Sequence, residues 1–376
     1  MRFVIAPDSF KESMTAEQAA NAMEKGIRNV CETCEVVKVP LADGGEGTAD
    51  ILINHLGAKV IETEVTGPLG DKVIATYGIS SGVTAIMDVA SVIGLHHVSK
   101  EKRNPLQTST YGVGELILHA LDCGVNNFII GLGGSSTNDG GIGMLQALGV
   151  EILNDRGNPV ARGGAGLSEV AKINTHTLDK RLKNCTFTIV SDVDNVLLGP
   201  KGATYTYGRQ KGADDPMLRQ LEHAMEQYVK VIERDTGQDV ANEAGAGAAG
   251  GLGAAFMAFL QTEMKRGIDF VIELTELEKE IKRADVVFTG EGKIDDQTLN
   301  GKTLLGVASL AKKHQVPVIA IVGANHITRK KVYSSGITAI FPIVQHPLTL
   351  QESIANAAKL TEQTVENIVR LILSQQ

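Results

Sequence analysis

At five places along the chain, carboxylate side chains follow closely on an apolar run. A single aspartate that follows an apolar run usually caps a helix. Carboxylates after five such runs indicate that these residues share a function. Carboxylates hold hydrated Mg²⁺, while glycine-rich turns and lysines neutralise a phosphoryl group in transfer. The pattern therefore points to a site that binds Mg²⁺ and phosphate together. The polar residues concerned are Asp8, Lys11, Asp43, Glu46, Asn138, Asp139, Asp192, Asp194, Glu291, Asp295 and Lys302.

Glycine, 41 of the 376 residues, is concentrated in four segments. Three of them, residues 43–47, 131–143 and 290–292, directly follow an apolar run, where open α/β sheets bind their ligands. Glycine lets backbone N–H groups approach an anion there. We expect the longest segment to contain a phosphate-binding loop made of Gly133, Gly134, Ser135, Ser136, Thr137 and Asn138.

Two standard phosphate-binding motifs are each incomplete in this sequence. The fourth glycine-rich segment, residues 245–253, has the letters of a dinucleotide fingerprint, but residues 237–244 before it are not an apolar strand. We expect its glycines to allow close packing at a helix start instead. Residues 301–303 end like a P-loop, yet Asp296 stands where that motif needs glycine.

Composition argues against several classes of protein. The net charge of −8 and an aromatic content of 4% without tryptophan disfavour a nucleic-acid binder, which needs clustered positive charge and stacking surfaces. The longest apolar run, residues 316–324, is about half of what a bilayer requires. The apolar run at the start of the sequence is too short for the hydrophobic region of a signal peptide. We therefore expect a cytoplasmic protein that binds neither nucleic acid nor membrane.

Cysteine and histidine give no sign of a redox or metal centre. Four cysteines are too few for a disulfide framework in a chain of this length. Cys31 and Cys34 have C-x-x-C spacing, but they fall where a helix ends and not at a helix start, so we expect two unpaired thiols. The nine histidines are scattered, and we assign them no metal.

The elements that must position the polar residues begin with a βαβ unit. Residues 2–6 form a short apolar run typical of a buried strand. The capping-box pattern at Thr15 opens a helix, and residues 36–41 form the second strand. This order predicts parallel strands joined by a crossover. Three further apolar strands separated by helices are expected near the C-terminus, at residues 284–289, 316–322 and 337–343.

The middle of the chain has a different pattern. Residues 59–66 and 72–80 alternate apolar and polar side chains across a glycine-proline turn, as an antiparallel hairpin does. We predict an α/β protein with two α/β domains. Residues 1–64 and 285–376 form a discontinuous, Rossmann-like domain with a doubly wound parallel sheet, and residues 65–284 form an inserted domain with a mixed sheet.

These motifs, taken in order, resemble those of the bacterial glycerate kinase family of the glycerate 2-kinase type, and the resemblance covers essentially the whole chain. Three positions depart from it: Glu12 where glycine is common, Ser136 where alanine is common, and Val196 where proline is common. The matching segments are residues 6–13 (APDSFKES), 42–48 (ADGGEGT), 65–70 (VTGPLG), 133–141 (GGSSTNDGG), 210–213 (QKGA), 245–251 (GAGAAGG) and 290–295 (GEGKID).

The resemblance implies ATP-dependent phosphorylation of D-glycerate to 2-phosphoglycerate, with Mg²⁺ as cofactor. It also implies two α/β domains, one of them discontinuous, with the active site in the cleft between them. We expect a monomer or a homodimer. The sequence leaves open which domain holds the nucleotide.

Within that mechanism we assign roles to the polar residues. Asp192 is the predicted base or metal-facing acid, and Asp8 and Lys11 complete the catalytic set. Ser9 joins Asp8 and Lys11 in contacting substrate or phosphate. Substrate binding is further assigned to Asp43, Gly44, Gly45 and Glu46; charge neutralisation at the nucleotide to Lys211 and Lys302; and Mg²⁺ binding to Glu291 and Asp295.

Three alternatives remain open at this stage. The enzyme could phosphorylate the 3-hydroxyl of glycerate or another small hydroxy acid. A nicotinamide-dependent oxidoreductase could use the same type of sheet, but it needs a strand-led fingerprint. A non-catalytic sensor could close two domains on a small acid without chemistry.

Overall fold

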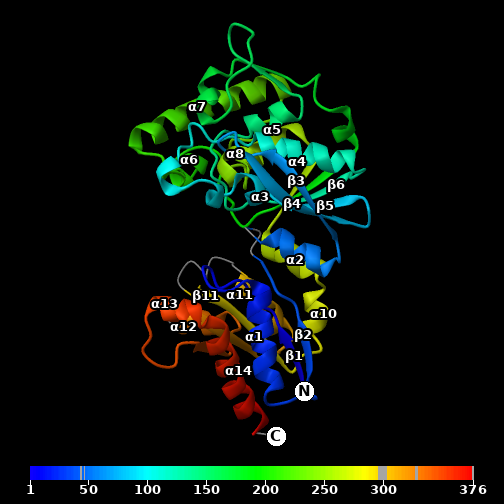
Figure 1. Cartoon of the computed structure of the whole chain (residues 1–376), viewed down its shortest axis with the longest axis vertical. Helices are drawn as coiled ribbons and strands as arrows, with labels where there is room; N and C mark the ends of the chain where they lie inside the picture. The colour runs from blue at the N-terminus through cyan, green and yellow to red at the C-terminus, as the bar shows by residue number, and fades with distance from the viewer. Residues whose placement is uncertain (43–44, 46, 295–302, 327–328, 375–376) are drawn as a thin grey trace. The chain divides into compact units, whose positions relative to one another are not determined.

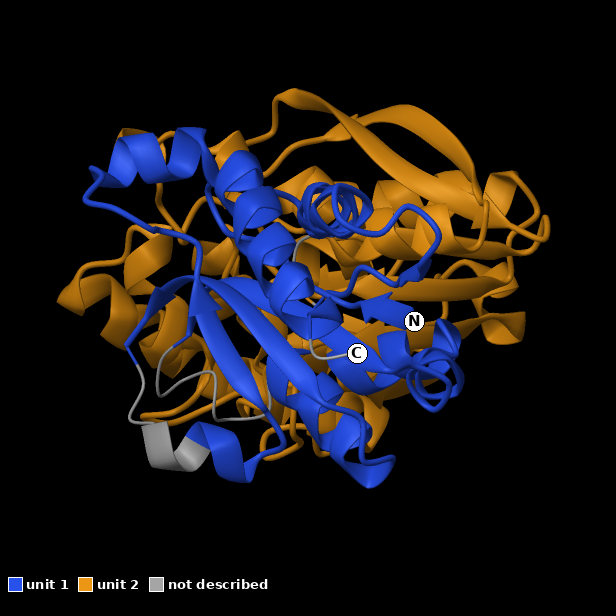
Figure 2. Cartoon of the chain, turned by 90° about the horizontal axis from the view of Figure 1, so that it is seen from below, with its two compact units in different colours: residues 1–43, 268–376 blue, residues 44–267 orange. Residues whose placement is uncertain are grey.

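The computed structural model describes residues 1–42, 45, 47–294, 303–326 and 329–374, and these form two compact units (Figure 1). Unit 1 comprises residues 1–43 and 268–376, and unit 2 comprises residues 44–267 (Figure 2). The sequence indicated domain boundaries after residues 64 and 284, whereas the two units divide after residues 43 and 267. These boundaries differ because the strand at residues 59–66 pairs within unit 2, while the helix at residues 277–281 packs within unit 1.

Unit 1 contains a parallel five-stranded sheet in the order β13-β12-β11-β1-β2. The N-terminal strand β1 lies between strands from both halves of the unit, with Phe3 opposite Val286 in β11 and Val36 in β2. The predicted doubly wound parallel sheet is therefore confirmed. The strands are β1 (Arg2–Ile5), β2 (Glu35–Lys38), β11 (Val286–Ile294), β12 (Val318–Asn325) and β13 (Ala339–Pro342).

Helices cover both faces of this sheet, because alternate residues of each strand point to opposite sides. Ile319 and Ile321 of β12 belong to the core beneath α1 and α14, which pack against each other. Ala320 and Val322 belong to a second core beneath α11 and α12. The helices of the unit are α1 (Ala16–Arg28), α9 (Gly267–Leu274), α10 (Leu277–Ile281), α11 (Thr303–Lys313), α12 (Arg329–Ser334), α13 (Leu350–Ala355) and α14 (Ala357–Leu373).

Unit 2 contains a six-stranded mixed sheet in the order β10-β9-β6-β5-β4-β3. Its first four strands run parallel, whereas β4 pairs antiparallel with both β5 and β3, as the alternating pattern predicted. The strands are β3 (Lys59–Thr66), β4 (Lys72–Ser80), β5 (Thr84–Asp88), β6 (Asn127–Gly131), β9 (Thr186–Val190) and β10 (Thr262–Lys265), beside a separate antiparallel pair, β7 (Glu151–Leu153) and β8 (Lys172–Asn174).

The core of unit 2 lies between its sheet and its helices. Phe128 of β6 stacks on Phe187 of β9 at a ring-centroid distance of 4.7 Å, and Phe256 of α8 packs against Phe187. The helices are α2 (Thr48–His55), α3 (Ala90–Ile93), α4 (Tyr111–Asp122), α5 (Ile142–Ala147), α6 (Ala203–Tyr207), α7 (Asp215–Thr236) and α8 (Ala248–Phe259), with 3-10 turns at Leu95–His97, Lys100–Lys102, Gly164–Glu169, Lys180–Asn184 and Arg209–Lys211.

The glycines at residues 245–253 serve packing, as the sequence indicated. No strand precedes them, and a left-handed kink interrupts α8 at residues 249–251. A side-chain carbon added to Gly250 would lie 2.1 Å from the carbonyl oxygen of Thr137. The absence of a side chain therefore lets α8 touch the loop that follows β6.

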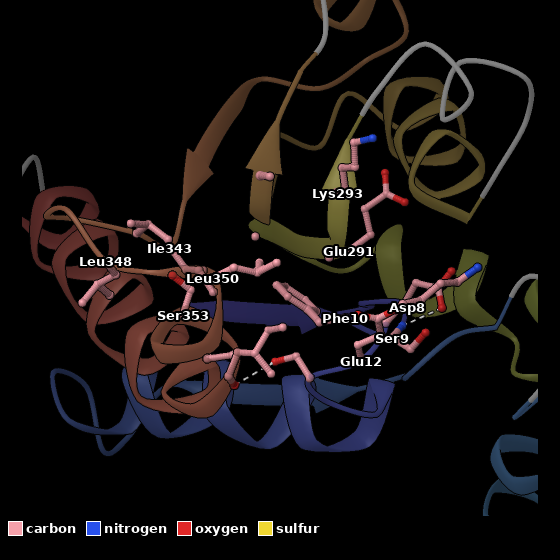
Figure 3. A pocket seen from close by; sticks show the side chains of 18 of the residues that line it. Asp8, Ser9, Phe10, Glu12, Glu291, Lys293, Ile343, Leu348, Leu350 and Ser353 are labelled. Atoms are coloured by element: carbon pink, nitrogen blue, oxygen red, sulfur yellow. Dashed lines mark hydrogen bonds between the residues drawn. The ribbon is translucent and has the colours of Figure 1, made fainter. Parts of the chain in front are cut away.

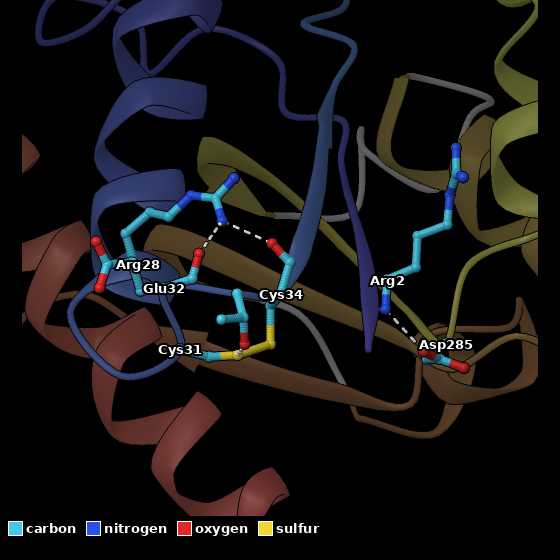
Figure 4. Close-up of a disulfide and its surroundings, with 7 residues drawn as sticks. Arg2, Arg28, Cys31, Glu32, Cys34 and Asp285 are labelled. Carbon is cyan, nitrogen blue, oxygen red and sulfur yellow. Dashed lines mark hydrogen bonds between the residues drawn. A yellow bond between two sulfur atoms is a disulfide. The ribbon is translucent and has the colours of Figure 1, made fainter.

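Cys31 and Cys34 form a disulfide, so the expectation of two unpaired thiols was wrong (Figure 4). The turn between α1 and β2 brings their Cα atoms to 5.5 Å, a separation that a disulfide can span. Nη1 of Arg28 holds the same turn by donating to the carbonyl oxygens of Glu32 and Cys34. Within the described residues, no helix combines the length and apolar character needed to cross a bilayer.

Candidate functional site

A pocket of about 780 Å³ opens in unit 1 beside the carboxyl ends of β1, β11 and β12 (Figure 3). Asp8, Ser9 and Lys11 line it from the loop after β1, and Glu291 lines it from β11. A side-chain carbon at Gly292 would lie 3.2 Å from the backbone nitrogen of Lys11, so glycine lets this loop close onto the strand. The structure thus brings together four residues that the sequence analysis had selected.

Hydrogen bonds of its backbone and its carboxylate hold Asp8 in place. Its backbone N–H donates to the carbonyl of Gly290 at 2.8 Å, and its carboxylate accepts from the backbone of Ser9 at 2.6 Å and the hydroxyl of Thr303 at 2.8 Å. Glu12 in the same loop adopts a φ of 68°, a left-handed conformation that costs a side-chain-bearing residue about 1–2 kcal/mol. This conformation gives a physical reason for the glycine that is common at its position.

Several predicted residues lie outside the part of the chain that the structure describes: Asp43, Gly44, Glu46, Asp295 and Lys302. Gly45 is described and belongs to unit 2. Its carbonyl oxygen accepts hydrogen bonds from the backbone and the hydroxyl of Thr48, the first residue of α2. In the described structure, Gly45 therefore stabilises the start of a helix.

The predicted phosphate-binding loop follows β6 in unit 2, and most of it is buried. Ser136 donates its hydroxyl to the carbonyl of Ile93 at 2.8 Å, and the side-chain amide of Asn138 donates to the hydroxyl of Thr204 at 3.2 Å. Ser135 and Thr137 are also buried. Of the predicted loop, Gly134 is exposed and Gly133 is half-buried, so the backbone at these glycines is the accessible part.

Lys211 lies beneath this loop and is only 2% exposed. Its ammonium group donates to the carbonyl oxygen of Thr137 at 2.6 Å and to the hydroxyl of Ser135 at 3.0 Å. Burial lowers the pKa of Lys211 to about 7, although the charge of Asp139 acts in the opposite direction. Lys211 is therefore an internal support of the loop and not a solvated surface lysine.

Lys211 should make the stability of the protein depend on pH. Between about pH 7 and the ordinary lysine pKa of 10.5, the folded protein holds Lys211 neutral while the unfolded chain still protonates it. The unfolded state then binds more protons, so the contribution of Lys211 makes the free energy of unfolding rise with pH in this window. Urea unfolding at about pH 7 and pH 9 should show a larger rise for the wild type than for Lys211→Met.

Lys230→Met is the matched control, because Lys230 is exposed on α7 of the same unit. Its pH dependence should equal that of the wild type. If the free energy of unfolding rises equally with pH for the wild type and Lys211→Met, Lys211 does not titrate between these pH values.

Asp139 ends the loop and is fully buried. Its carboxylate accepts from the backbone and hydroxyl of Thr110 at 2.8 and 2.9 Å, and from the backbone N–H groups of Gly141 and Gly143 at 3.1 and 3.3 Å. Burial raises its pKa, while these hydrogen bonds lower it. Asp139 thus caps the start of α5 and ties it to the residue before α4.

Asp192 follows β9, and one of its carboxylate oxygens accepts from the backbone of Gly267 at 3.0 Å. Sequence reasoning missed Asp88, the last residue of β5. Asp88 is 8% exposed, and its carboxylate accepts from the backbone N–H groups of Gly47 and Ala49 at 2.9 and 3.1 Å. The sequence held a signal for it, because Asp88 directly follows the short apolar run Ala85–Met87.

Asp88, the loop beginning at Leu132, and Asp192 therefore lie at the carboxyl ends of three neighbouring parallel strands, β5, β6 and β9. This edge of a parallel sheet is where α/β proteins bind ligands. The carboxylates at this edge could accept a proton, and the accessible backbone of Gly133 and Gly134 could contact an anion.

No group of three or more histidine, cysteine, aspartate or glutamate side chains that could hold a metal ion occurs among the described residues. Mg²⁺ is commonly held by one or two carboxylates together with water and substrate phosphates. Asp8 and Glu291, which line the same pocket, are a donor set of that kind. These residues fit Mg²⁺ if a nucleotide supplies the remaining oxygens.

Comparison with known proteins gives a consistent result across the chain. The model of the family described as "Glycerate kinase family" matches residues 3–373. A glycerate kinase of Haemophilus influenzae is 46% identical over 99% of each chain, and a glycerate 2-kinase of Escherichia coli is 46% identical over 95% of this chain and 94% of its own.

The fold agrees with this sequence similarity. A crystal structure described as "putative glycerate kinase 2 from Salmonella typhimurium LT2" matches with a TM-score of 0.88 and 43% identity, covering 100% of this chain and 99% of the other. The chain therefore belongs to the glycerate kinase family, as its motifs predicted.

Proposed function

We propose that this protein transfers the γ-phosphoryl group of ATP to the 2-hydroxyl of D-glycerate, forming 2-phosphoglycerate and ADP. The family match along residues 3–373 is the observation that carries this function, and the E. coli relative named a glycerate 2-kinase supports position 2. We expect the reaction to take place in the cytoplasm, where ATP is available.

The chemistry requires three contributions from the protein. It must fix the glycerate carboxylate, accept the proton of the attacking hydroxyl, and neutralise the phosphoryl group. A bond forms between the hydroxyl oxygen and the γ-phosphorus, the bond from that phosphorus to the leaving ADP breaks, and the hydroxyl proton passes to a base. We assign the base to Asp192, because it follows a strand and Gly267 fixes one of its oxygens.

Residues of unit 1 are proposed to bind the ligands of the reaction. Asp8, Ser9 and Lys11 share one pocket, in which hydrogen bonds from Ser9 and Thr303 orient Asp8. Lys11 supplies positive charge for a carboxylate or phosphate. Our further assignments to substrate, nucleotide and metal rest on sequence alone for Asp43, Gly44, Glu46, Lys302 and Asp295.

Mg²⁺, when bound, would neutralise phosphate charge, and we propose Glu291 and Asp8 as its carboxylate ligands. In unit 2, we propose that the backbone N–H groups at Gly133 and Gly134 contact phosphate. Lys211 then acts from beneath, by fixing the carbonyl of Thr137 and the hydroxyl of Ser135.

The test is to incubate the purified protein with D-glycerate, ATP and Mg²⁺, and to measure ADP release. We expect release to depend on glycerate, and ³¹P NMR to identify 2-phosphoglycerate as the product. A 3-phosphoglycerate signal would overturn the assignment of the 2-hydroxyl while leaving a kinase. Glycerate binding without ADP release would instead favour a sensor, and omission of ATP serves as the blank.

A further inference from the structure

The pocket of unit 1 has two chemically different ends (Figure 3). Asp8, Glu291 and Lys293 give one end its charge, and Phe10 lies between the two ends. The opposite end is formed by α13, the first residue of α14 and the segment between β13 and α13. Its apolar lining residues are Ile343, Val344, Leu348, Leu350, Ile354 and Ala357.

Glycerate does not match the apolar end of the pocket chemically. It is a three-carbon acid whose carboxylate and two hydroxyls all require polar partners. A pocket of about 780 Å³ lies in the range that holds cofactor-sized ligands. A nucleotide matches both ends, because it joins a flat, largely apolar base to a charged phosphate chain.

The apolar end also leaves apolar surface exposed to water. Leu350 is 75% exposed, although it lines the pocket and follows the capping residue of α13. Ile343 and Ala357, which line the same end, are buried and form a wall. A planar ring lying on this wall would remove the Leu350 side chain from water, which is favourable in proportion to the area covered.

Two hydroxyls in the lining provide polar contacts for such a ring. Ser13 donates to the carbonyl oxygen of Ile354 at 3.2 Å, and Ser353 donates to that of Thr349 at 2.9 Å. With their hydrogens engaged in this way, both hydroxyl oxygens can offer only lone pairs to a ligand. The 6-amino group of adenine is a hydrogen-bond donor and suits such acceptors.

We propose that the adenine base of ATP binds at the apolar end of this pocket, against Leu348, Leu350 and Ile354, with the phosphate chain of the nucleotide toward Asp8 and Glu291. The proposal rests on the proposed use of ATP and adds the place where the base is recognised. It makes unit 1 the unit that holds adenosine.

Leu350→Asp tests this placement, because Leu350 is exposed and can change without disturbing the core. A carboxylate against the base should raise both the calorimetric Kd and the KM for ATP by about tenfold or more. The KM for glycerate should stay within about twofold, since glycerate does not contact this end. Binding of inorganic triphosphate, which has no base, should be unchanged.

Leu371→Asp is the matched control, because Leu371 is 60% exposed in the same unit and does not line the pocket. It should bind ATP like the wild type, and circular dichroism should show both variants folded. Unchanged ATP affinity in Leu350→Asp would overturn the proposal. A raised KM for glycerate alone would also overturn it, by placing the acid in the pocket.

The test of where the base binds can be decided independently of the test of the kinase reaction. A wild-type protein that binds ATP but releases no ADP with glycerate would refute the kinase reaction. The calorimetric comparison of Leu350→Asp with Leu371→Asp requires no turnover, and it would still decide where the base binds.

Discussion

Asp192→Asn should lower the kcat for glycerate phosphorylation by about 10²–10⁴-fold, the usual contribution of a positioned general base. Asparagine has nearly the same shape, and its amide oxygen can still accept the hydrogen bond from Gly267. It cannot take a proton from the attacking hydroxyl. Glycerate-dependent ADP release, measured at saturating substrates, reports the change directly.

Asp155→Asn is the control for this variant. Asp155 is an exposed turn residue of the same unit and is not among the residues selected for the site, so its replacement should leave kcat within about twofold of the wild type. If Asp192→Asn is folded and turns over within a few-fold of the wild type, the proton goes elsewhere and Asp192 only holds the loop.

Asp139→Ala should destabilise the protein by at least about 4 kcal/mol, because it leaves four buried donors without their acceptor. These donors belong to Thr110, Gly141 and Gly143. The free energy of unfolding in urea measures the effect.

Asp155→Ala provides the comparison, since Asp155 is an exposed turn residue of the same unit and its loss should change stability by less than about 0.5 kcal/mol. A loss of under about 1 kcal/mol for Asp139→Ala would mean that water replaces the carboxylate at low cost. The cap described for α5 would then contribute little to the fold.

The elements of this fold were predictable wherever local chemistry determines them. The capping box predicted at Thr15 is present with both reciprocal hydrogen bonds, and a second capping box occurs at Thr349. The alternation at residues 59–66 and 72–80 produced the β3–β4 hairpin, because one face of that pair packs on the core and the other faces solvent. The continuous apolar runs became parallel strands, and those of β1, β11 and β12 are buried along most of their length.

Features that depend on residues far apart in the chain were harder to predict from the sequence. The burial of Lys211 arises from contacts with Ser135 and Thr137, which lie 76 and 74 residues away in the chain. No periodicity or motif encodes such a contact. The family resemblance identified the loop and the lysine separately, but only the fold shows that the lysine lies under the loop.

The remaining features that the sequence analysis did not predict depend on local geometry. The disulfide between Cys31 and Cys34 depends on a turn that brings two Cα atoms together, and composition alone does not determine that distance. The role of Asp88 depends on α2 beginning beside the end of β5, so that two N–H groups reach one carboxylate. The candidate site was thus predictable in its residue types and less so in its internal supports.

Unit 1 is assembled from both ends of the chain, and this has a consequence for biosynthesis. During translation β1 emerges first, yet its neighbour β11 leaves the ribosome only after all of unit 2. The nascent chain can therefore complete the contiguous unit 2 early, while the first 43 residues wait with one strand edge of β1 uncovered. Premature termination before residue 286 would leave that edge without its parallel neighbour, and so open to association with other chains.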